Sequence, residues 1–270
     1  MSRRLRLDAE LVRRGLARSR DHASSLIEQR LVTVGGAMAM KPATGVTTDQ
    51  AIVVKDSLDP GYASRGAYKL LGALNVFKPQ GLIIKGKRCL DAGASTGGFT
   101  DILLREGASS VCAVDVGYGQ LVWALQSDDR VNVLDRRNVR TLIPADVGGM
   151  VDLVVSDLSF ISLTVVMPAL TSVCEPKGDV VLMIKPQFEV GRSNLGKKGV
   201  VRDPDQHAGA ILKVCHSGHD LGWGTHSLAP SPLPGPAGNV EYFCWLRRGA
   251  PAPTRASVEE VVAAGPLAER

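Results

Sequence analysis

Short apolar runs alternate with helix-like segments through most of the chain. The runs that predict strands are 88–90, 111–114, 131–134, 153–155 and 180–184. This alternation is typical of an α/β domain built on a parallel, doubly wound sheet. A last apolar run, 240–246, follows a proline- and glycine-rich loop. Its place after the strand–helix series predicts that the last strand is antiparallel in a mostly parallel sheet.

The N-terminal part of the chain follows a different pattern. Residues 8–14 predict a short helix that ends at Gly15, and Ser19 is placed to cap a second helix. Two short apolar runs, 32–34 and 52–54, predict strands. The pattern therefore predicts a small α+β domain.

Turn-forming residues separate this small domain from the larger one. We expect the α+β domain over 1–58, a linker at 59–63 and the α/β domain over 64–248. The remaining tail, 249–270, is rich in Pro and Ala, and Ser257 is placed in it to cap a short helix.

The bulk composition indicates a soluble globular protein. The chain has 270 residues, of which 44% are apolar, enough for a sizeable core. No apolar leader follows the basic residues at its start, and the longest uncharged run, 158–174, is too short and polar for a membrane span. The five cysteines lack C-x-x-C spacing, and the five histidines lack metal-ligand spacing. We therefore expect a cytoplasmic protein with buried cysteines, no metal site and no membrane partner.

The net charge of +5 is concentrated near the N-terminus. Residues 1–55 contain ten basic and five acidic side chains, whereas the rest of the chain is balanced. A basic excess confined to one small segment is typical of a nucleic-acid-binding surface. A solvated charged face is the alternative, and charge alone favours neither.

The glycine-rich turn at 91–100, Asp-Ala-Gly-Ala-Ser-Thr-Gly-Gly-Phe-Thr, is the first candidate ligand site. It has neither the Gly-Lys-Ser/Thr of a Walker loop nor the G-x-G-x-x-G of a dinucleotide site, and it contains no Lys or Arg. These absences argue against a polyphosphate ligand. Asp115 ends the next apolar run, where a ribose-binding acid stands in nucleotide-binding folds. The glycines could instead serve only tight packing of strand against helix.

The pattern Asp-x-Gly-x-x-x-Gly-Gly-Phe, followed by Asp115, resembles the S-adenosylmethionine loop of Rossmann-like methyltransferases. The resemblance implies S-adenosylmethionine as the cofactor. The residues that it assigns to cofactor binding are Asp91, Gly93, Ala94, Ser95, Thr96, Gly97, Gly98, Phe99, Asp115 and Asn138. Asn138 follows the third strand, where adenine contacts occur in this fold, but it could equally cap the next segment.

Four charged residues are the candidate catalytic groups. Ligands bind outside the carboxyl ends of strands in an open parallel sheet, and Asp157 and Lys185 directly follow predicted strands. An antiparallel last strand brings Glu241 to the same edge, and Lys69, on the helix before the first strand, is placed to reach it. A lysine at the end of a strand is usually only a solvated surface residue. The four residues therefore indicate a catalytic site only when they are taken together.

These residues match, in order and local context, the Lys-Asp-Lys-Glu tetrad of the FtsJ-like ribose 2'-O-methyltransferases. The motifs Ser-Arg-Gly-Ala-x-Lys-Leu, Asp-Leu-Ser-Phe, Lys-Pro-Gln-Phe-Glu and Gly-Asn-Val-Glu-Tyr-Phe narrow the resemblance. A ribose hydroxyl is a weak nucleophile and needs a base to draw its proton away. Lys185 is the candidate for that base.

The N-terminal pattern, from Leu7-Asp-Ala-Glu-Leu-Val-Arg-Arg-Gly to Lys41-Pro42, resembles an S4 RNA-binding domain. The arginines that we assign to RNA binding are Arg3, Arg4, Arg6, Arg14, Arg18, Arg20 and Arg65. An S4 domain joined to this tetrad is similar to the TlyA family. That resemblance implies 2'-O-methylation of cytidines in 16S and 23S ribosomal RNA, with ribosomal subunits as the partners.

The chain departs from the family pattern at two places. Arg30 stands where the family usually has the glycine that ends the second helix, a position that often takes a left-handed turn. In the linker, Pro60-Gly61-Tyr62-Ala63 replaces the usual Arg-x-Trp-Val. If the linker helps to organise the cofactor site, the second departure would alter the coupling between the domains, and the sequence does not decide between these cases.

Two other classes of function compete with an enzyme. A noncatalytic ribosome-binding factor would need the basic domain but not the tetrad. A membrane-active cytolysin is the second, because TlyA relatives also carry a hemolysin label. The sequence offers neither an export signal nor a convincing membrane segment for it.

Overall fold

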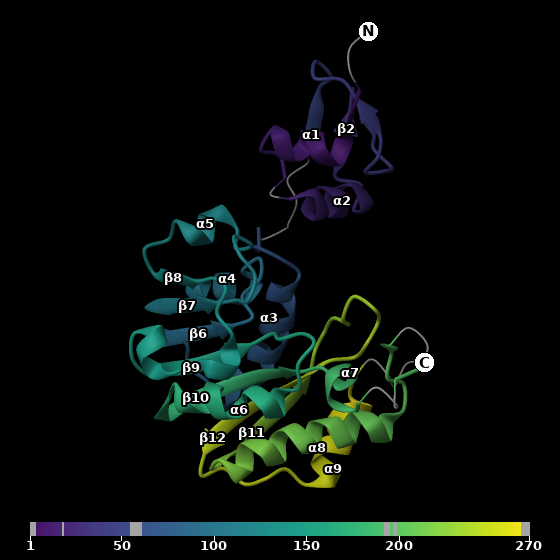
Figure 1. Ribbon diagram of the computed structural model, residues 1–270. Helices are drawn as coiled ribbons and strands as arrows, with labels where there is room; N and C mark the ends of the chain where they lie inside the picture. Colours follow the sequence, from purple (N-terminus) through teal and green to yellow (C-terminus); the bar gives the residue numbers. More distant parts are fainter. Residues whose placement is uncertain (1–3, 18, 55–60, 192–194, 197–198, 266–270) are drawn as a thin grey trace. The chain divides into compact units, whose positions relative to one another are not determined.

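The computed structural model describes residues 4–17, 19–54, 61–191, 195–196 and 199–265 (Figure 1). The chain divides into two compact units, residues 1–64 and 65–270.

The N-terminal unit packs two helices against small antiparallel sheets. Its elements are β1 (Leu5–Arg6), α1 (Leu7–Arg13), α2 (Arg20–Glu28), β2 (Val32–Val34), β3 (Ala37–Met38), β4 (Gly45–Val46) and β5 (Ile52–Val54). β2 lies between β3 and β5, and β1 pairs with β4. Leu7 and Leu11 of α1 and Leu26 and Ile27 of α2 form its buried core.

Local signals in this unit act as the sequence predicts. The Ser19 hydroxyl accepts a hydrogen bond from the His22 N–H at 3.1 Å and caps α2. Arg30 has a φ of 58°, so the left-handed turn expected at the end of the second helix is present, with arginine in it. The two-residue strands β1, β3 and β4 were not predicted, because two residues are too few to show an alternating pattern.

The C-terminal unit is built on a seven-stranded sheet of order β11-β12-β10-β9-β6-β7-β8. The strands are β6 (Arg88–Ala92), β7 (Ser110–Val114), β8 (Val131–Leu134), β9 (Val151–Ser156), β10 (Cys174–Ile184), β11 (Trp223–Pro230) and β12 (Tyr242–Arg248). β8, β7, β6, β9 and β10 are parallel, and β12 is antiparallel to β10 and β11. The predicted fold class, including the antiparallel last strand, is confirmed.

Helices cover both faces of this sheet (Figure 1). They are α3 (Gly66–Phe77), α4 (Gly98–Arg105), α5 (Trp123–Gln126), α6 (Leu163–Ser172), α7 (Pro186–Glu189), α8 (Pro204–Asp220) and α9 (Arg255–Ala263), with short 3-10 turns at Lys78–Gln80, Val139–Thr141 and Pro144–Val147. α6, α8 and α9 share one hydrophobic cluster with the sheet, and α3 packs beside α4 on the opposite face. α6 lies within the uncharged run 158–174, and most of its residues are buried.

The C-terminal tail packs against the edge strand β11. The Thr225 N–H donates to the Pro251 carbonyl at 2.8 Å, and Val258 and Val262 of α9 are buried. α9 is capped by the hydroxyl of Thr254, three residues before the expected cap. The tail therefore satisfies part of an otherwise open sheet edge.

All five cysteines are buried and reduced. No helix among the described residues has both the length and the apolar character needed to cross a membrane.

Candidate active site

The glycine-rich turn joins β6 to α4 at the carboxyl edge of the sheet. Gly93 and Gly97 have φ values of 91° and 100°, which favour glycine, and Ser95 also takes a positive φ of 46°. A Cβ on Gly93 would lie 2.6 Å from the Asp157 carbonyl oxygen, and one on Gly97 would lie 2.3 Å from Leu125 Cδ1. The two glycines therefore allow the turn to pack closely against Asp157 and Leu125. Ser95, which lies between them, is exposed.

Asp115 holds the turn from the neighbouring strand. It directly follows β7, and its carboxylate accepts hydrogen bonds from the Ser95 N–H at 2.8 Å and the Gly117 N–H at 2.7 Å. The acid that the sequence places at a ribose therefore also fixes the backbone of the turn.

Asp91 is fully buried near the end of β6. One carboxylate oxygen accepts a hydrogen bond from the Thr100 hydroxyl at 2.7 Å, whereas Oδ1 has no hydrogen-bond partner among the described residues. Burial raises the pKa of Asp91 to about 7, and the nearby Asp157 and Asp115 act in the same direction. Asp91 is therefore a buried acid with one oxygen still available.

The other residues assigned to the cofactor divide into exposed and buried groups. Thr96 is exposed like Ser95, whereas Ala94 and Phe99 are buried. The Phe99 ring lies 6.0 Å from that of Phe243, so it belongs to the core beneath the turn. The Asn138 side chain accepts a hydrogen bond from the Arg140 N–H at 3.0 Å, so it caps the 3-10 turn after β8.

Lys69 and Glu241 form one buried ion pair, with Nζ 2.5 Å from Oε2. Their side chains are 11% and 1% exposed. The loop before β12 closes over this pair, because a Cβ on Gly235 would lie 2.7 Å from Glu241 Oε1. The pair is thus held by α3 on one side and by the start of β12 on the other.

Lys185 and Asp157 form a second pair, with Nζ 2.6 Å from Oδ1. Lys185 also donates a hydrogen bond to the Ser159 hydroxyl at 2.8 Å. The Lys185 side chain is 10% exposed, and that of Asp157 is 23% exposed. Asp157 therefore forms the more open side of the second pair.

Strand register explains why the two pairs occupy one edge of the sheet. Ile184 of β10 pairs with Tyr242 of β12 in antiparallel register, so Lys185 and Glu241 are the next residues on neighbouring strands. Asp157 follows β9, the parallel neighbour of β10 on its other side. The sheet order β12-β10-β9-β6 thus places the candidate catalytic residues next to the strand that leads into the glycine-rich turn.

The structure also exposes an aromatic side chain that we did not select from the sequence. Phe160 is 91% exposed and has a φ of 65°, a strained conformation for a bulky residue. Its ring lies 5.2 Å from that of Phe188 of α7. Because Phe160 directly follows Ser159, it stands beside the second ion pair. The only signal in the sequence was its position just after Asp157-Leu-Ser.

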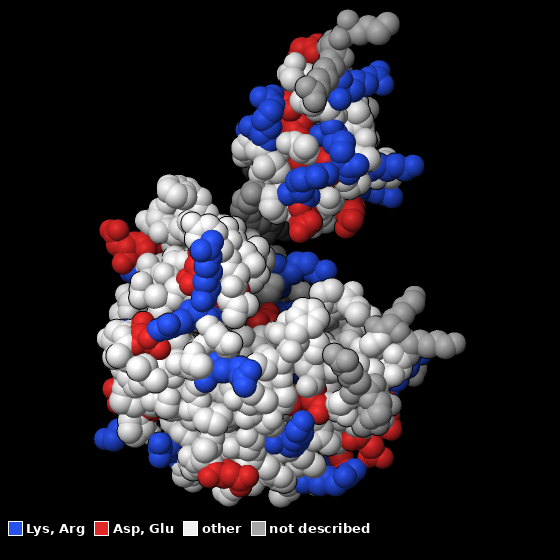
Figure 2. Space-filling model, in the orientation of Figure 1, with Lys and Arg blue, Asp and Glu red and all other residues white. Residues whose placement is uncertain are grey.

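Three of the four described N-terminal arginines assigned to RNA binding have acidic partners within their own unit. Arg6 and Arg20 contact Asp8, and Arg14 contacts Glu10. Arg4 is exposed, whereas Arg3 and Arg18 lie outside the described residues. Figure 2 shows Lys and Arg side chains over much of the visible surface of this unit, with Asp and Glu between them. In the C-terminal unit, Arg65 is exposed one turn before Lys69.

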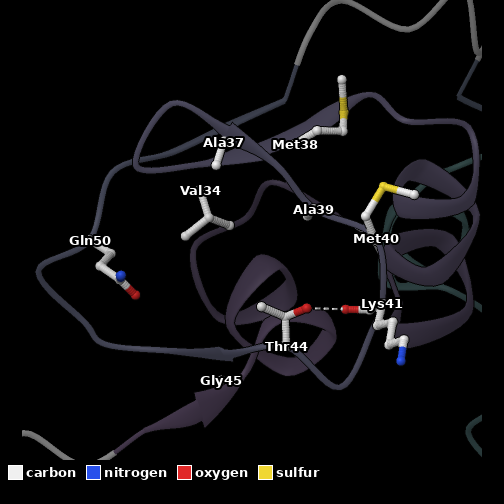
Figure 3. A pocket seen from close by; sticks show the side chains of 9 residues that line it. All are labelled: Val34, Ala37, Met38, Ala39, Met40, Lys41, Thr44, Gly45 and Gln50. Atoms are coloured by element: carbon white, nitrogen blue, oxygen red, sulfur yellow. Dashed lines mark hydrogen bonds between the residues drawn. The ribbon is translucent and has the colours of Figure 1, made fainter.

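The N-terminal unit has a shallow hollow of about 360 Å³ (Figure 3). Its lining is Val34, Ala37, Met38, Ala39, Met40, Lys41, Thr44, Gly45 and Gln50. Lys41 is the one charged residue in that set, and Thr44 donates a hydrogen bond to its carbonyl at 2.7 Å. The hollow contains no acid–base pair, so the candidate active site is the edge of the larger sheet.

Two families match the two units. The FtsJ-like methyltransferase family matches residues 62–248, and the S4 domain matches residues 5–52. Fold and site together define a methyltransferase of the FtsJ-like class that carries an N-terminal S4 domain.

The similar proteins make the family more specific. The 16S/23S rRNA (cytidine-2'-O)-methyltransferase TlyA of Mycobacterium tuberculosis is 54% identical over 247 residues, which cover 92% of this chain and 91% of that protein. Hemolysin A of Brachyspira hyodysenteriae is 34% identical over 88% of this chain and 98% of its own length. A solved structure from Streptococcus thermophilus, described as a candidate hemolysin, has a TM-score of 0.76 and 36% identity over 98% of this chain and 96% of its own. The chain belongs to the TlyA family.

Proposed function

We propose that this protein transfers a methyl group from S-adenosylmethionine to the ribose 2'-hydroxyl of cytidine in 16S and 23S ribosomal RNA. The observation that carries the proposal is the pair of lysine–carboxylate contacts at the edge of the sheet, beside the glycine-rich turn. The TlyA relative, whose name describes this reaction, supports the choice of substrate. Ribosomal subunits are the proposed partners, and the activity would take place in the cytoplasm.

The residues around the turn fit S-adenosylmethionine. When bound, this cofactor supplies a methyl group on a positively charged sulfur. Asp91, Asp115 and Asp157 stand at the ends of three adjacent strands, and the turn between them contains no Lys or Arg. Carboxylates attract a cationic ligand, and Asp91 Oδ1 is a buried oxygen that no described residue satisfies. Asp115 would accept from the ribose of the cofactor, and exposed Ser95 and Thr96 would line the entrance.

The two ion pairs would orient the reacting hydroxyl and handle its proton. Lys185 Nζ is fixed by Asp157 and Ser159, so it has a defined position at the mouth of the site. Lys185, reacting as the neutral amine, would take the proton from the 2'-hydroxyl when the methyl group is transferred to the oxygen, and the ammonium that results is the form that pairs with Asp157. Lys69 and Glu241, the more buried pair, would hold the neighbouring strand and the ribose in place.

Phe160 supplies a surface for the target base. A ribose inside an RNA helix or a stacked loop reaches such a site only when its nucleotide is turned out, and an aromatic ring then compensates for part of the lost stacking. Phe160 is exposed, held at a positive φ and placed next to Lys185's partner Ser159. Its ring would stack on the cytosine. The S4 domain would bind RNA that is near the target nucleotide, either in sequence or in the folded RNA.

The direct test is transfer of a labelled methyl group from S-adenosylmethionine to unmodified 30S and 50S subunits. We expect wild-type protein to label both, Lys185→Met to label neither, and Lys177→Met, which changes an exposed lysine near the other end of β10, to retain activity. Folded protein that binds subunits and cofactor without transferring the methyl group would defeat the proposal. Dye release from liposomes without methyl transfer would support the lytic activity named in the hemolysin relatives.

A further inference from the structure

Two nearly buried acids on α1 hold a set of arginines at the surface of the N-terminal unit. Asp8 is 3% exposed and receives Nε and Nη2 of Arg6 at 3.0 and 2.9 Å, together with Nη2 of Arg20 at 2.9 Å. Glu10 is 1% exposed and receives Nε and Nη2 of Arg13 at 2.7 and 2.6 Å, together with Nε of Arg14 at 2.7 Å. Each acid therefore connects two guanidinium groups.

The four arginines do not have the same surroundings. Arg14 also donates to the backbone carbonyls of Thr47, Thr48 and Gln50, and its side chain is only 20% exposed. The side chains of Arg6, Arg13 and Arg20 are 53%, 57% and 60% exposed. Arg14 is thus a structural tie between α1 and the segment before β5, whereas the other three present part of each guanidinium to solvent.

A guanidinium whose inner edge is bound to a fixed carboxylate has lost most of its rotamer freedom before any ligand arrives. Its remaining N–H groups then lie in a defined plane, and binding a phosphate no longer has to order a long flexible side chain. Hydrogen bonds from Arg13 and Arg14 lower the pKa of Glu10 to about 2, and those from Arg6 and Arg20 hold the pKa of Asp8 well below its ordinary value. Both acids therefore stay ionised over the working range of pH.

We propose that Asp8 and Glu10 are positioning residues for RNA binding, which hold Arg6, Arg20 and Arg13 in the orientation that contacts the phosphate backbone. The inference rests on the proposed function, because it takes RNA as the ligand of the S4 domain. Net charge alone predicts the opposite effect of these acids on RNA affinity. Removing an acid from a basic surface raises the positive charge and should tighten RNA binding, whereas loss of orientation weakens it.

The test compares two Asp→Asn substitutions, which change the net charge by the same amount. Asp8→Asn removes the acid between Arg6 and Arg20, and Asp21→Asn removes an exposed acid in the first turn of α2. With unmodified ribosomal subunits as the probe, we expect Asp8→Asn to weaken binding roughly tenfold and to raise KM with little change in kcat. Asp21→Asn should bind as tightly as wild type or slightly more tightly.

A double-mutant cycle separates positioning from a purely structural role. In a protein that already carries Arg6→Ala and Arg20→Ala, Asp8→Asn should not weaken binding further, because no guanidinium is left to orient and only the gain in net positive charge remains. An equal loss in both backgrounds, or wild-type or tighter binding by Asp8→Asn, would overturn the proposal. Amide hydrogen exchange of α1 and α2 shows whether each variant keeps its fold.

A surface substitution keeps the inference testable if Asp8→Asn unfolds the unit. Arg6→Lys preserves the charge but cannot form the two parallel bonds to Asp8. It should weaken binding severalfold, while the matched change Arg30→Lys on the loop after α2 should not, and equal behaviour of the two would contradict the proposal. Wild-type protein that binds no RNA at all would instead count against the proposed function.

Discussion

The Lys69–Glu241 pair is the contact whose loss we expect to cost the C-terminal unit most. Glu241→Gln would leave the Lys69 ammonium, on a side chain only 11% exposed, without its carboxylate at 2.5 Å. Breaking one side of a buried ion pair typically costs about 3–5 kcal/mol, because the remaining charge is neither paired nor hydrated. The closed loop at Gly235 leaves little room for water to compensate. The free energy of unfolding should therefore fall by about 3–5 kcal/mol.

Urea unfolding followed by tryptophan fluorescence measures this change in the intact chain. All three tryptophans, at 123, 223 and 245, lie in the C-terminal unit, so the signal reports on that unit alone. Lys69→Met combined with Glu241→Gln should recover most of the stability, since no buried charge remains, yet stay inactive in methyl transfer.

A matched pair on the surface provides the control. Lys78 and Glu106 are 2.6 Å apart but 47% and 24% exposed, so Glu106→Gln should cost less than about 1 kcal/mol. If Glu241→Gln costs no more than Glu106→Gln, the reasoning from burial is refuted.

Three further predictions follow. Arg30→Gly should stabilise the N-terminal unit by up to about 1 kcal/mol, because glycine relieves the left-handed φ of 58°; faster amide exchange in α2 would contradict this. Phe160→Ala should raise KM for subunits roughly tenfold without altering cofactor affinity, whereas Val165→Ala, another exposed apolar residue, should leave KM unchanged. Burial raises the pKa of Asp91 to about 7, so between about pH 4 and 7 the folded unit holds a proton that the unfolded chain has released. The stability that this bound proton contributes is fully present below about pH 4 and is lost as the pH rises to 7. Because asparagine does not titrate, the urea midpoint of Asp91→Asn should fall less between pH 5 and 7.5 than that of wild type.

Most strands of the sheet, and the candidate site residues that follow them, could be predicted from the sequence. The parallel strands are short apolar runs bounded by turns, and β8 and both predicted N-terminal strands have the expected limits. β11 was missed, because its pattern, Trp-Gly-Thr-His-Ser-Leu-Ala-Pro, mixes small and polar residues on an edge strand that α8, α9 and the tail help to cover. Its pairing depends on β12 and on tertiary contacts that no local pattern records.

The candidate site was predictable as a set of residues but not as a set of contacts. The position of charged residues directly after strands identified Asp157 and Lys185. The pairing of Lys69 with Glu241 and of Lys185 with Asp157 could not be predicted, because it depends on α3 and on strand register. The same is true of the N-terminal unit. Composition showed a basic surface, but only the fold shows that Arg14 serves mainly to tie two segments together.

The measurement that tests the central claim most directly is the chemical identity of the methylated product. Subunits from cells that lack this protein are incubated with it and S-adenosylmethionine, their 16S and 23S RNA are separated, and each is digested to nucleosides for mass spectrometry. The account predicts new 2'-O-methylcytidine in both RNAs with wild-type protein and none with Lys185→Met. Methyl groups found on a base, or no methylated ribose despite binding of subunits and cofactor, would contradict it.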